Sequence, residues 1–196
     1  MFIQVIQGKL KDAALFERQI DSWRRDIKPG AKGYLGSTSG TTADGRSITL
    51  ARFESEAAAK ANSERPEQGR WWNETAKAID GDPTFYDCRE VDTMFGGGSN
   101  DAGFVQVIQA RAKNQEQMRS RSADMEGRLR ERRPDILGMV IAWHGDGGYT
   151  QAVYFASEAE ARRGEKETEQ DQLRKEFMSM METQPTFFDL TRPDLD

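Results

Sequence analysis

The segment Phe2-Ile3-Gln4-Val5-Ile6-Gln7 returns 102 residues later as Phe104-Val105-Gln106-Val107-Ile108-Gln109. The same offset aligns Pro83-Thr84-Phe85-Tyr86-Asp87 with Pro185-Thr186-Phe187-Phe188-Asp189 without a gap. Over residues 2–92, 23 of the 91 aligned positions are identical, which is far above chance. The chain is therefore an internal duplication, and a repeat of this length has to be recognised before any fold is predicted.

The two copies support one reading of the secondary structure. Each begins with a β-rich run, followed by an amphipathic helix, a hairpin, a second helical region and a final strand. The turn Asp44-Gly45 is a strong hairpin signal, and Ser55 and Ser157 are candidate N-caps of the second helical region. Pro66 either breaks this region or opens a second short helix. The order β-α-β-β-α-β, twice, predicts two ferredoxin-like repeats.

The predicted domains follow the duplication. Repeat 1 covers residues 1–93, repeat 2 covers residues 104–196, and the Gly/Ser-rich residues 94–103 form a linker between them. In this plan both helices of a repeat lie on one face of its sheet, and the other face must be covered. We expect the two antiparallel sheets to pack face to face within one chain.

Composition excludes several classes of protein. One cysteine and one histidine in 196 residues leave no intrachain disulfide and no Cys/His metal cluster. No apolar run is long enough to span a membrane, and the N-terminus lacks the features of a signal peptide. With a net charge of −5 and 36% hydrophobic residues, the chain is expected to be a soluble, cytoplasmic protein with no metal.

At this level of detail the chain resembles the dimeric α+β barrel superfamily, and within it the antibiotic biosynthesis monooxygenase (ABM)-like domains. The resemblance rests on the order of elements, on the segments Phe53-Glu54-Ser55-Glu56-Ala57 and Phe155-Ala156-Ser157-Glu158-Ala159, and on the Pro-Thr-Phe-x-Asp strands. Members usually pair two chains of about half this length. The resemblance therefore implies an α+β fold in which the tandem repeats form an intramolecular dimeric α+β barrel.

The resemblance also implies a function. It suggests a cofactor-independent monooxygenase-like protein that acts on a small aromatic or quinol-type substrate, with no cofactor. The alternative is a non-catalytic protein of the same fold that binds a small ligand or serves in assembly. Haem degradation is disfavoured, because residues 55–80 and 157–182 contain no histidine and the first strands carry glutamine where haem-degrading members have asparagine.

Five residues are candidates for a ligand pocket, although no catalytic residue is assigned. Gln4 and Gln106 lie mid-strand between apolar neighbours, so they either bind a ligand inside the barrel or form a structural hydrogen bond to each other. Arg52, whose counterpart is Tyr154, could anchor an anionic or phenolate oxygen. Trp71 either lines a pocket or belongs to the core.

The charge of the chain and its family resemblance indicate which binding partners to expect. The first helix of repeat 2 is rich in arginine, but acidic residues interleave with it and the whole chain is acidic, which argues against nucleic acid. The single histidine, His144, is expected in an exposed turn. We expect a small aromatic ligand, no membrane partner, and either a monomeric pseudo-dimer or a homo-oligomer.

Overall fold

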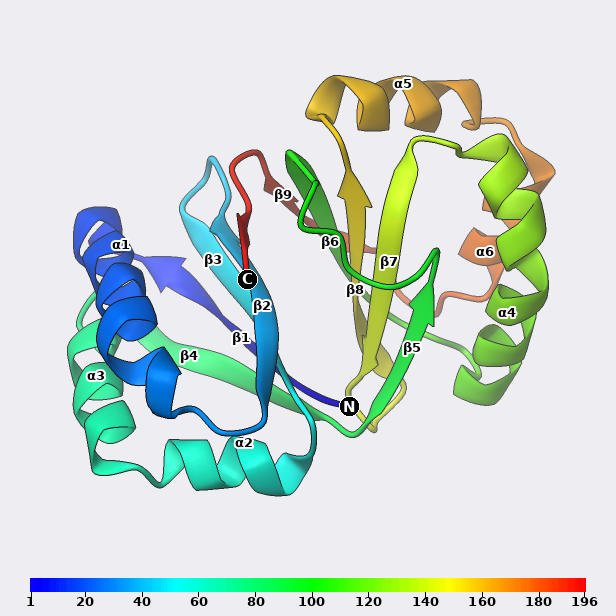
Figure 1. The fold of residues 1–196 in the computed structure, drawn as a ribbon. Coiled ribbons are helices and arrows are strands. Elements are labelled where there is room, and N and C mark those ends of the chain that lie inside the picture. Colours follow the sequence, from blue (N-terminus) through cyan, green and yellow to red (C-terminus); the bar gives the residue numbers. More distant parts are fainter. The chain divides into compact units, whose positions relative to one another are not determined.

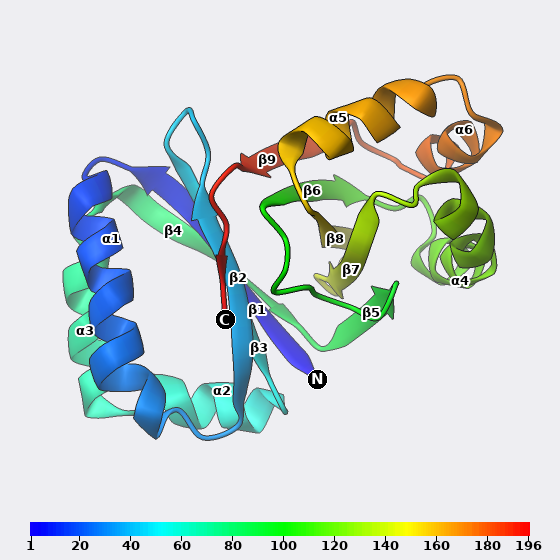
Figure 2. The same cartoon turned by 45° about the horizontal axis from the view of Figure 1, so that its top comes forward.

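The computed structural model describes residues 1–196 as two compact units, each built around one copy of the repeat (Figure 1). Unit 1 comprises Met1–Arg89 with Asp194–Asp196, and unit 2 comprises Glu90–Pro193. The predicted α+β class and the order β-α-β-β-α-β are confirmed in both units. Each unit holds a five-stranded antiparallel sheet with helices on one face (Figure 1 and Figure 2).

Unit 1 follows the predicted elements closely. Its sheet has the strand order β10-β2-β3-β1-β4. Pro66 opens a separate helix, as the sequence suggested, because proline fits the first helical position. The bounds are β1 Phe2–Leu10, α1 Ala13–Ser22, η1 Trp23–Ile27, η2 Lys28–Gly30, β2 Tyr34–Thr41, β3 Arg46–Phe53, α2 Glu56–Ser63, α3 Pro66–Ala76, β4 Ile79–Cys88 and β10 Asp194–Leu195.

Unit 2 repeats the plan with the strand order β5-β7-β8-β6-β9. Its first helix, α4, is a single long helix, whereas the counterpart in unit 1 ends in a π-helical turn and a 3₁₀ turn. The bounds are β5 Glu90–Met94, β6 Phe104–Arg111, α4 Gln115–Arg132, β7 Ile136–Trp143, β8 Gly148–Phe155, α5 Glu158–Glu167, α6 Gln172–Ser179 and β9 Thr186–Leu190.

Side-chain caps fix where the helices begin. The hydroxyl of Ser55 accepts a hydrogen bond from the backbone N–H of Ala58 at 3.1 Å, and Ser157 does the same for Glu160 at 3.3 Å. Such caps satisfy backbone donors that have no partner within the helix. Both predicted N-caps are therefore confirmed. None of the helices combines the length and the apolar character needed to cross a bilayer.

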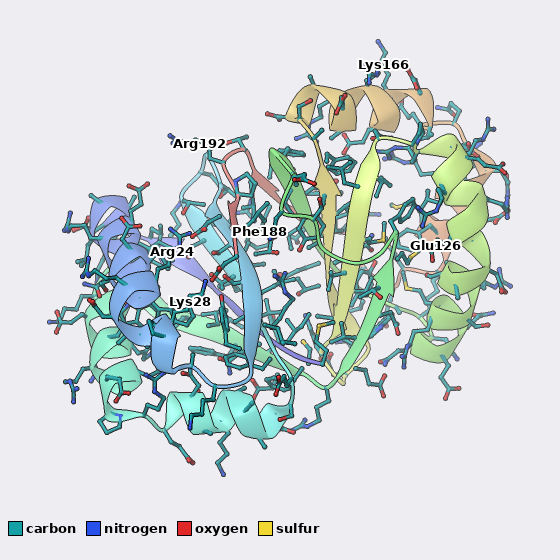
Figure 3. All side chains as sticks on the ribbon, in the orientation of Figure 1. Arg24, Lys28, Glu126, Lys166, Phe188 and Arg192 are labelled. Atoms are coloured by element: carbon teal, nitrogen blue, oxygen red, sulfur yellow. The ribbon has the colours of Figure 1, made fainter.

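Each sheet contains one short strand that comes from the end of the other repeat. β5 lies at the end of repeat 1 but pairs with β7 of unit 2, while β10 lies at the end of repeat 2 but pairs with β2 of unit 1. Ion pairs from Arg24 to Asp194 and from Lys28 to Asp196 hold β10 in place, and Figure 3 labels both basic residues. The compact units thus follow strand pairing, whereas the predicted limits follow the sequence repeat.

Gly36 is required where β10 meets β2. Its φ is +125°, and a Cβ added there would lie 2.1 Å from the backbone oxygen of Asp196.

We expect Gly36→Ala to detach β10 and to cost about 1–3 kcal/mol of unfolding free energy. Hydrogen exchange at the Ser37 amide, which donates to Asp196 at 3.0 Å, measures the detachment. Gly69→Ala in helix α3, where a Cβ meets nothing within 4 Å, should leave that exchange unchanged.

The helix-free face of each sheet is largely apolar in sequence. In unit 1 it carries Ile3 and Ile48, and in unit 2 it carries Val105 and Val107, because these residues alternate with those that face the helices. The closure of the two sheets into one barrel stays a prediction, as does the assembly. Light scattering would distinguish the 22.2 kDa monomer from a homo-oligomer.

Candidate functional site

A large cavity lies within unit 2, between its sheet and its helices. It has a volume of about 460 Å³. Its floor includes Gln106 on β6, Gln151 on β8 and Met139 on β7, and its walls include Met125 on α4 and Leu173 on α6. A few polar groups in a mostly apolar concave site are the usual features of a small-molecule pocket.

The equivalent space in unit 1 is much smaller, about 100 Å³. Aromatic rings from its helices and from β2 line it: the ring centroids of Trp23 and Trp71 lie 6.3 Å apart, and those of Trp23 and Tyr34 lie 4.9 Å apart. At the 102-residue offset, the two tryptophans correspond to Met125 and Leu173 in unit 2. The helix side of the cavity is therefore lined by shorter side chains in unit 2.

A missing helical turn also contributes to the difference. In unit 1, Pro66 starts α3. The counterpart of Pro66 is Thr168, and α6 begins only at Gln172, capped by Asp171. On the sheet side the change goes the other way, because Gln151 in unit 2 is longer than its counterpart Thr49 in unit 1 and takes up part of the added volume. The cavity thus arises from changes on the helix side of one duplicated copy.

Both candidate glutamines face the helices, and each bonds within its own unit. The Nε2 of Gln4 donates to Asp87 at 2.9 Å, and the Nε2 of Gln106 donates to Asp189 at 3.1 Å. The aspartates are also 102 residues apart, so this Gln–Asp pair is itself duplicated. The predicted hydrogen bond between the two glutamines is replaced by a bond to the last strand of each copy. Gln4 lines the small cavity and Gln106 lines the large one.

In unit 2 the pair is extended by an arginine. Arg162 on α5 forms an ion pair with Asp189 and also pairs with Glu165 at 3.1 Å. Burial lowers the pKa of Arg162, but its hydrogen bonds to these two carboxylates outweigh burial and raise the pKa above its ordinary value. The guanidinium also lies 5.3 Å from the ring centroid of Phe104. Arg162 therefore stays charged and holds Asp189 in one place.

A second glutamine on the floor has an unused oxygen. Gln151 is 4% exposed, its Nε2 lies 3.1 Å from the Sδ of Met139, and its Oε1 has no hydrogen-bond partner. A buried amide oxygen without a partner is costly and needs an explanation. Gln151 is paired in register with Ile108 and Ile141, so its side chain lies in the middle of the floor.

Arg52 and Tyr154 lie on the opposite sheet face from the glutamines and line neither cavity. The guanidinium of Arg52 donates to the backbone oxygen of Asp196 at 2.7 Å and to Thr38 Oγ1 at 3.2 Å. Tyr154 is 1% exposed. The five candidates are thus not brought together: one lines the large cavity, two line the small one, and two lie elsewhere.

Trp71 lines the small cavity and contributes to the packing of unit 1. Its Nε1 donates to the backbone oxygen of Gln19 at 2.7 Å, and its ring lies against Trp23 and Trp72. The hydrogen bond ties α3 to α1. These contacts favour the core interpretation of Trp71, in which the indole N–H finds a partner because it is removed from water.

His144 is half-buried, which corrects the expectation of an exposed turn. Its Nε2 lies 2.8 Å from Thr150 Oγ1. Burial lowers the pKa of His144 to about 4, with Asp146 opposing this change and Arg111 adding to it. The turn folds back onto the strand, so the ring loses water without gaining a carboxylate strong enough to compensate.

We expect His144 to titrate near pH 4 in the folded protein, followed by the single imidazole signal in an NMR titration. The unfolded histidine has a pKa of about 6.5 and binds a proton that the folded one does not. Stability should therefore fall as pH drops from about 6.5 to 4, by about 1–2 kcal/mol for this partly exposed group. His144→Gln should lose this part of the pH dependence, and a midpoint near 6.5 would contradict the expectation.

Solved structures with a similar fold cover the whole chain. A candidate monooxygenase from Lactobacillus acidophilus NCFM has 13% identity and a TM-score of 0.71, covering 100% of this chain and 98% of its own. A candidate monooxygenase from Fusobacterium nucleatum subsp. nucleatum has 8% identity and a TM-score of 0.74, covering 100% and 93%. An anthrone oxidase-like protein has 12% identity and a TM-score of 0.69, covering 99% and 92%. No protein-family model and no curated protein matches the chain.

These comparisons establish the fold. The chain has a tandem ferredoxin-like fold, as its resemblance to ABM-like domains implied. At identities of 8–13% the likeness extends to the fold alone, and one fold serves many functions. Function must therefore be argued from the cavity of unit 2.

Proposed function

We propose that this chain is a cofactor-independent monooxygenase-like protein that binds a small aromatic or quinol-type substrate in the cavity of unit 2. The observation that carries the proposal is the cavity itself. Its volume of about 460 Å³ falls within the range of about 300–1,000 Å³ typical of ligand pockets. Similarity of fold to an anthrone oxidase-like protein supports the choice of substrate class.

The lining suits a flat, apolar molecule. Phe155, Phe177 and Met125 offer aromatic and thioether surfaces that pack against rings. The polar groups of the lining include the amides of Gln106 and Gln151 on the floor. Such a site gains binding energy from apolar contact and orients the ligand through one or two hydrogen bonds.

The proposed reaction needs no external reductant. An activated CH₂ group of the substrate and O₂ give C=O and H₂O, so the substrate supplies the electrons that reduce the second oxygen atom. The chain would orient the substrate and keep water away from it. An amide group beside the ring would hydrogen-bond the oxygen-bearing end of the substrate and so orient it.

Oxygen consumption tests this proposal. The purified protein is mixed with anthrone and with 1,4-dihydroxynaphthalene, and O₂ uptake is compared with the rate of spontaneous oxidation. We expect protein-dependent uptake of one O₂ per anthrone, with one ¹⁸O atom from labelled O₂ in the product. Ligand binding without any protein-dependent uptake would contradict the oxygenase activity.

A second candidate function is binding without catalysis. The carboxylates that line the cavity are ion-paired: Asp189 and Glu165 with Arg162, and Asp171 with Arg132 at 3.0 Å. The lining contains no histidine, cysteine or tyrosine. A site with few groups free to move protons favours a protein that holds its ligand unchanged. Calorimetric binding of the same compounds, with the ligand recovered intact, would support this alternative.

A further inference from the structure

The orientation of the Gln106 amide is fixed by its partner. A carboxylate accepts hydrogen bonds and donates none, so Asp189 requires the NH₂ end of the amide to face it. The distance from Gln106 Nε2 to Asp189 Oδ1 is 3.1 Å. The carbonyl oxygen, Oε1, must then point the other way. Gln106 is 7% exposed and lines the cavity.

Arg162 holds the carboxylate that orients the amide. It forms an ion pair with Asp189 and is itself held by Glu158 at 3.2 Å and Glu165 at 3.1 Å. Charge-assisted contacts of this kind are stronger and better defined in geometry than neutral hydrogen bonds. Arg162 thus fixes the position of the Asp189 carboxylate, and Asp189 fixes the orientation of the Gln106 amide. We call these three residues the relay.

We propose that this relay makes the cavity selective for ligands that donate a hydrogen bond, such as a hydroxyl on an apolar ring, over the matching ether. This inference rests on the proposed function, because it assumes that the cavity of unit 2 binds the ligand. The acceptor is pre-positioned, so a hydroxyl meets it without rearrangement. An ether presents only oxygen lone pairs there and leaves a buried acceptor unpaired.

The floor holds a second amide whose oxygen has no partner. Gln151 Nε2 lies 3.1 Å from the thioether of Met139, a weak acceptor, which leaves Oε1 without a partner. Gln151 faces Ile108, two residues along β6 from Gln106, so the two amides are diagonal neighbours on one face. Because Gln151 Oε1 is covered by its surroundings, Gln106 is the acceptor that the proposal uses.

Unit 1 supplies a matched comparison. Gln4 and Asp87 form the same pair at 2.9 Å. Lys60 stands where unit 2 has Arg162, and it lies 3.9 Å from Glu64. The cavity that Gln4 lines is only about 100 Å³ and is bordered by aromatic rings. Only unit 2 combines the complete relay with a cavity large enough for a ring system.

The test measures preference rather than affinity alone. Binding of 2-naphthol and 2-methoxynaphthalene is measured by calorimetry without oxygen, so that turnover plays no part. We expect the parent protein to prefer the hydroxyl compound by about tenfold. In the Asp189→Asn variant, the side-chain amide at position 189 can accept or donate a hydrogen bond, so the Gln106 amide is free to rotate. The preference for the hydroxyl compound should therefore fall to about twofold. Asp87→Asn in unit 1 should keep the tenfold preference.

Each outcome has a defined meaning. Equal binding of the two compounds by the parent protein would overturn the inference and leave the proposed function standing. Binding of neither compound would overturn both. An unchanged preference in a folded Asp189→Asn protein would exclude the relay. If that variant does not fold, Gln106→Met decides, because it removes the acceptor and keeps the volume: it should still bind the ether and lose the preference for the hydroxyl.

Discussion

Replacing Leu173 with tryptophan is expected to abolish ligand binding in unit 2 and to leave the fold intact. The change installs the residue that unit 1 carries at the equivalent position, Trp71. Leu173 is 6% exposed and lines the cavity of about 460 Å³. The added ring therefore has empty space to enter, and the strain that usually accompanies a larger side chain in a packed core should be small.

Calorimetric titration with 2-naphthol measures this effect. We expect affinity to fall by at least about a hundredfold, since the ligand and the indole compete for one space. Leu173→Met, which keeps the volume, should bind within about threefold of the parent protein. The melting temperature of Leu173→Trp should stay equal or rise. Unchanged affinity in a folded Leu173→Trp protein would show that the ligand binds elsewhere.

The reciprocal change in unit 1, Trp71→Leu, is expected to destabilise the chain by about 2–3 kcal/mol. It removes the hydrogen bond from the indole to the backbone oxygen of Gln19 and the ring contacts with Trp23 and Trp72. The neighbouring side chains cannot collapse fully into the space, so a cavity term adds to the lost burial.

Urea unfolding followed by circular dichroism provides the measurement. The expected loss corresponds to a lower midpoint with an unchanged slope. Trp71→Phe, which keeps an aromatic ring, should cost about half as much. A loss below about 0.5 kcal/mol in Trp71→Leu would indicate that the ring lines a surface pocket and contributes little to the core of unit 1. Binding of 2-naphthol in unit 2 should not change.

The duplication made most of the fold predictable. Each copy could be checked against the other, so weak signals such as the N-caps at Ser55 and Ser157 became reliable. Pro66 was read as either a break or a helix start, and the structure selects the second. The exchange of β5 and β10 was not predicted, because strand pairing at a sheet edge depends on distant backbone groups that no local pattern reveals.

The candidate site was less predictable. Gln106 was identified because a polar residue stands between apolar strand positions, but its partners Asp189 and Arg162 were not. The signal for Asp189 was present: an aspartate retained in both Pro-Thr-Phe-x-Asp strands, together with a glutamine retained in both first strands. Arg52 was considered for a pocket because side chains alternate along a β-strand. This alternation places a residue on one face of the sheet but does not show what that face contacts.

The exchanged strands also govern how this chain can be divided. A fragment cut at residue 93 would carry β5 without the strand it pairs with, and it would leave the edge of β2 uncovered where β10 belongs. An uncovered edge is a template for aggregation. A genetic dissection of the two halves should therefore keep residues 90–193 together and return residues 194–196 to the first half, for example through a short engineered hairpin.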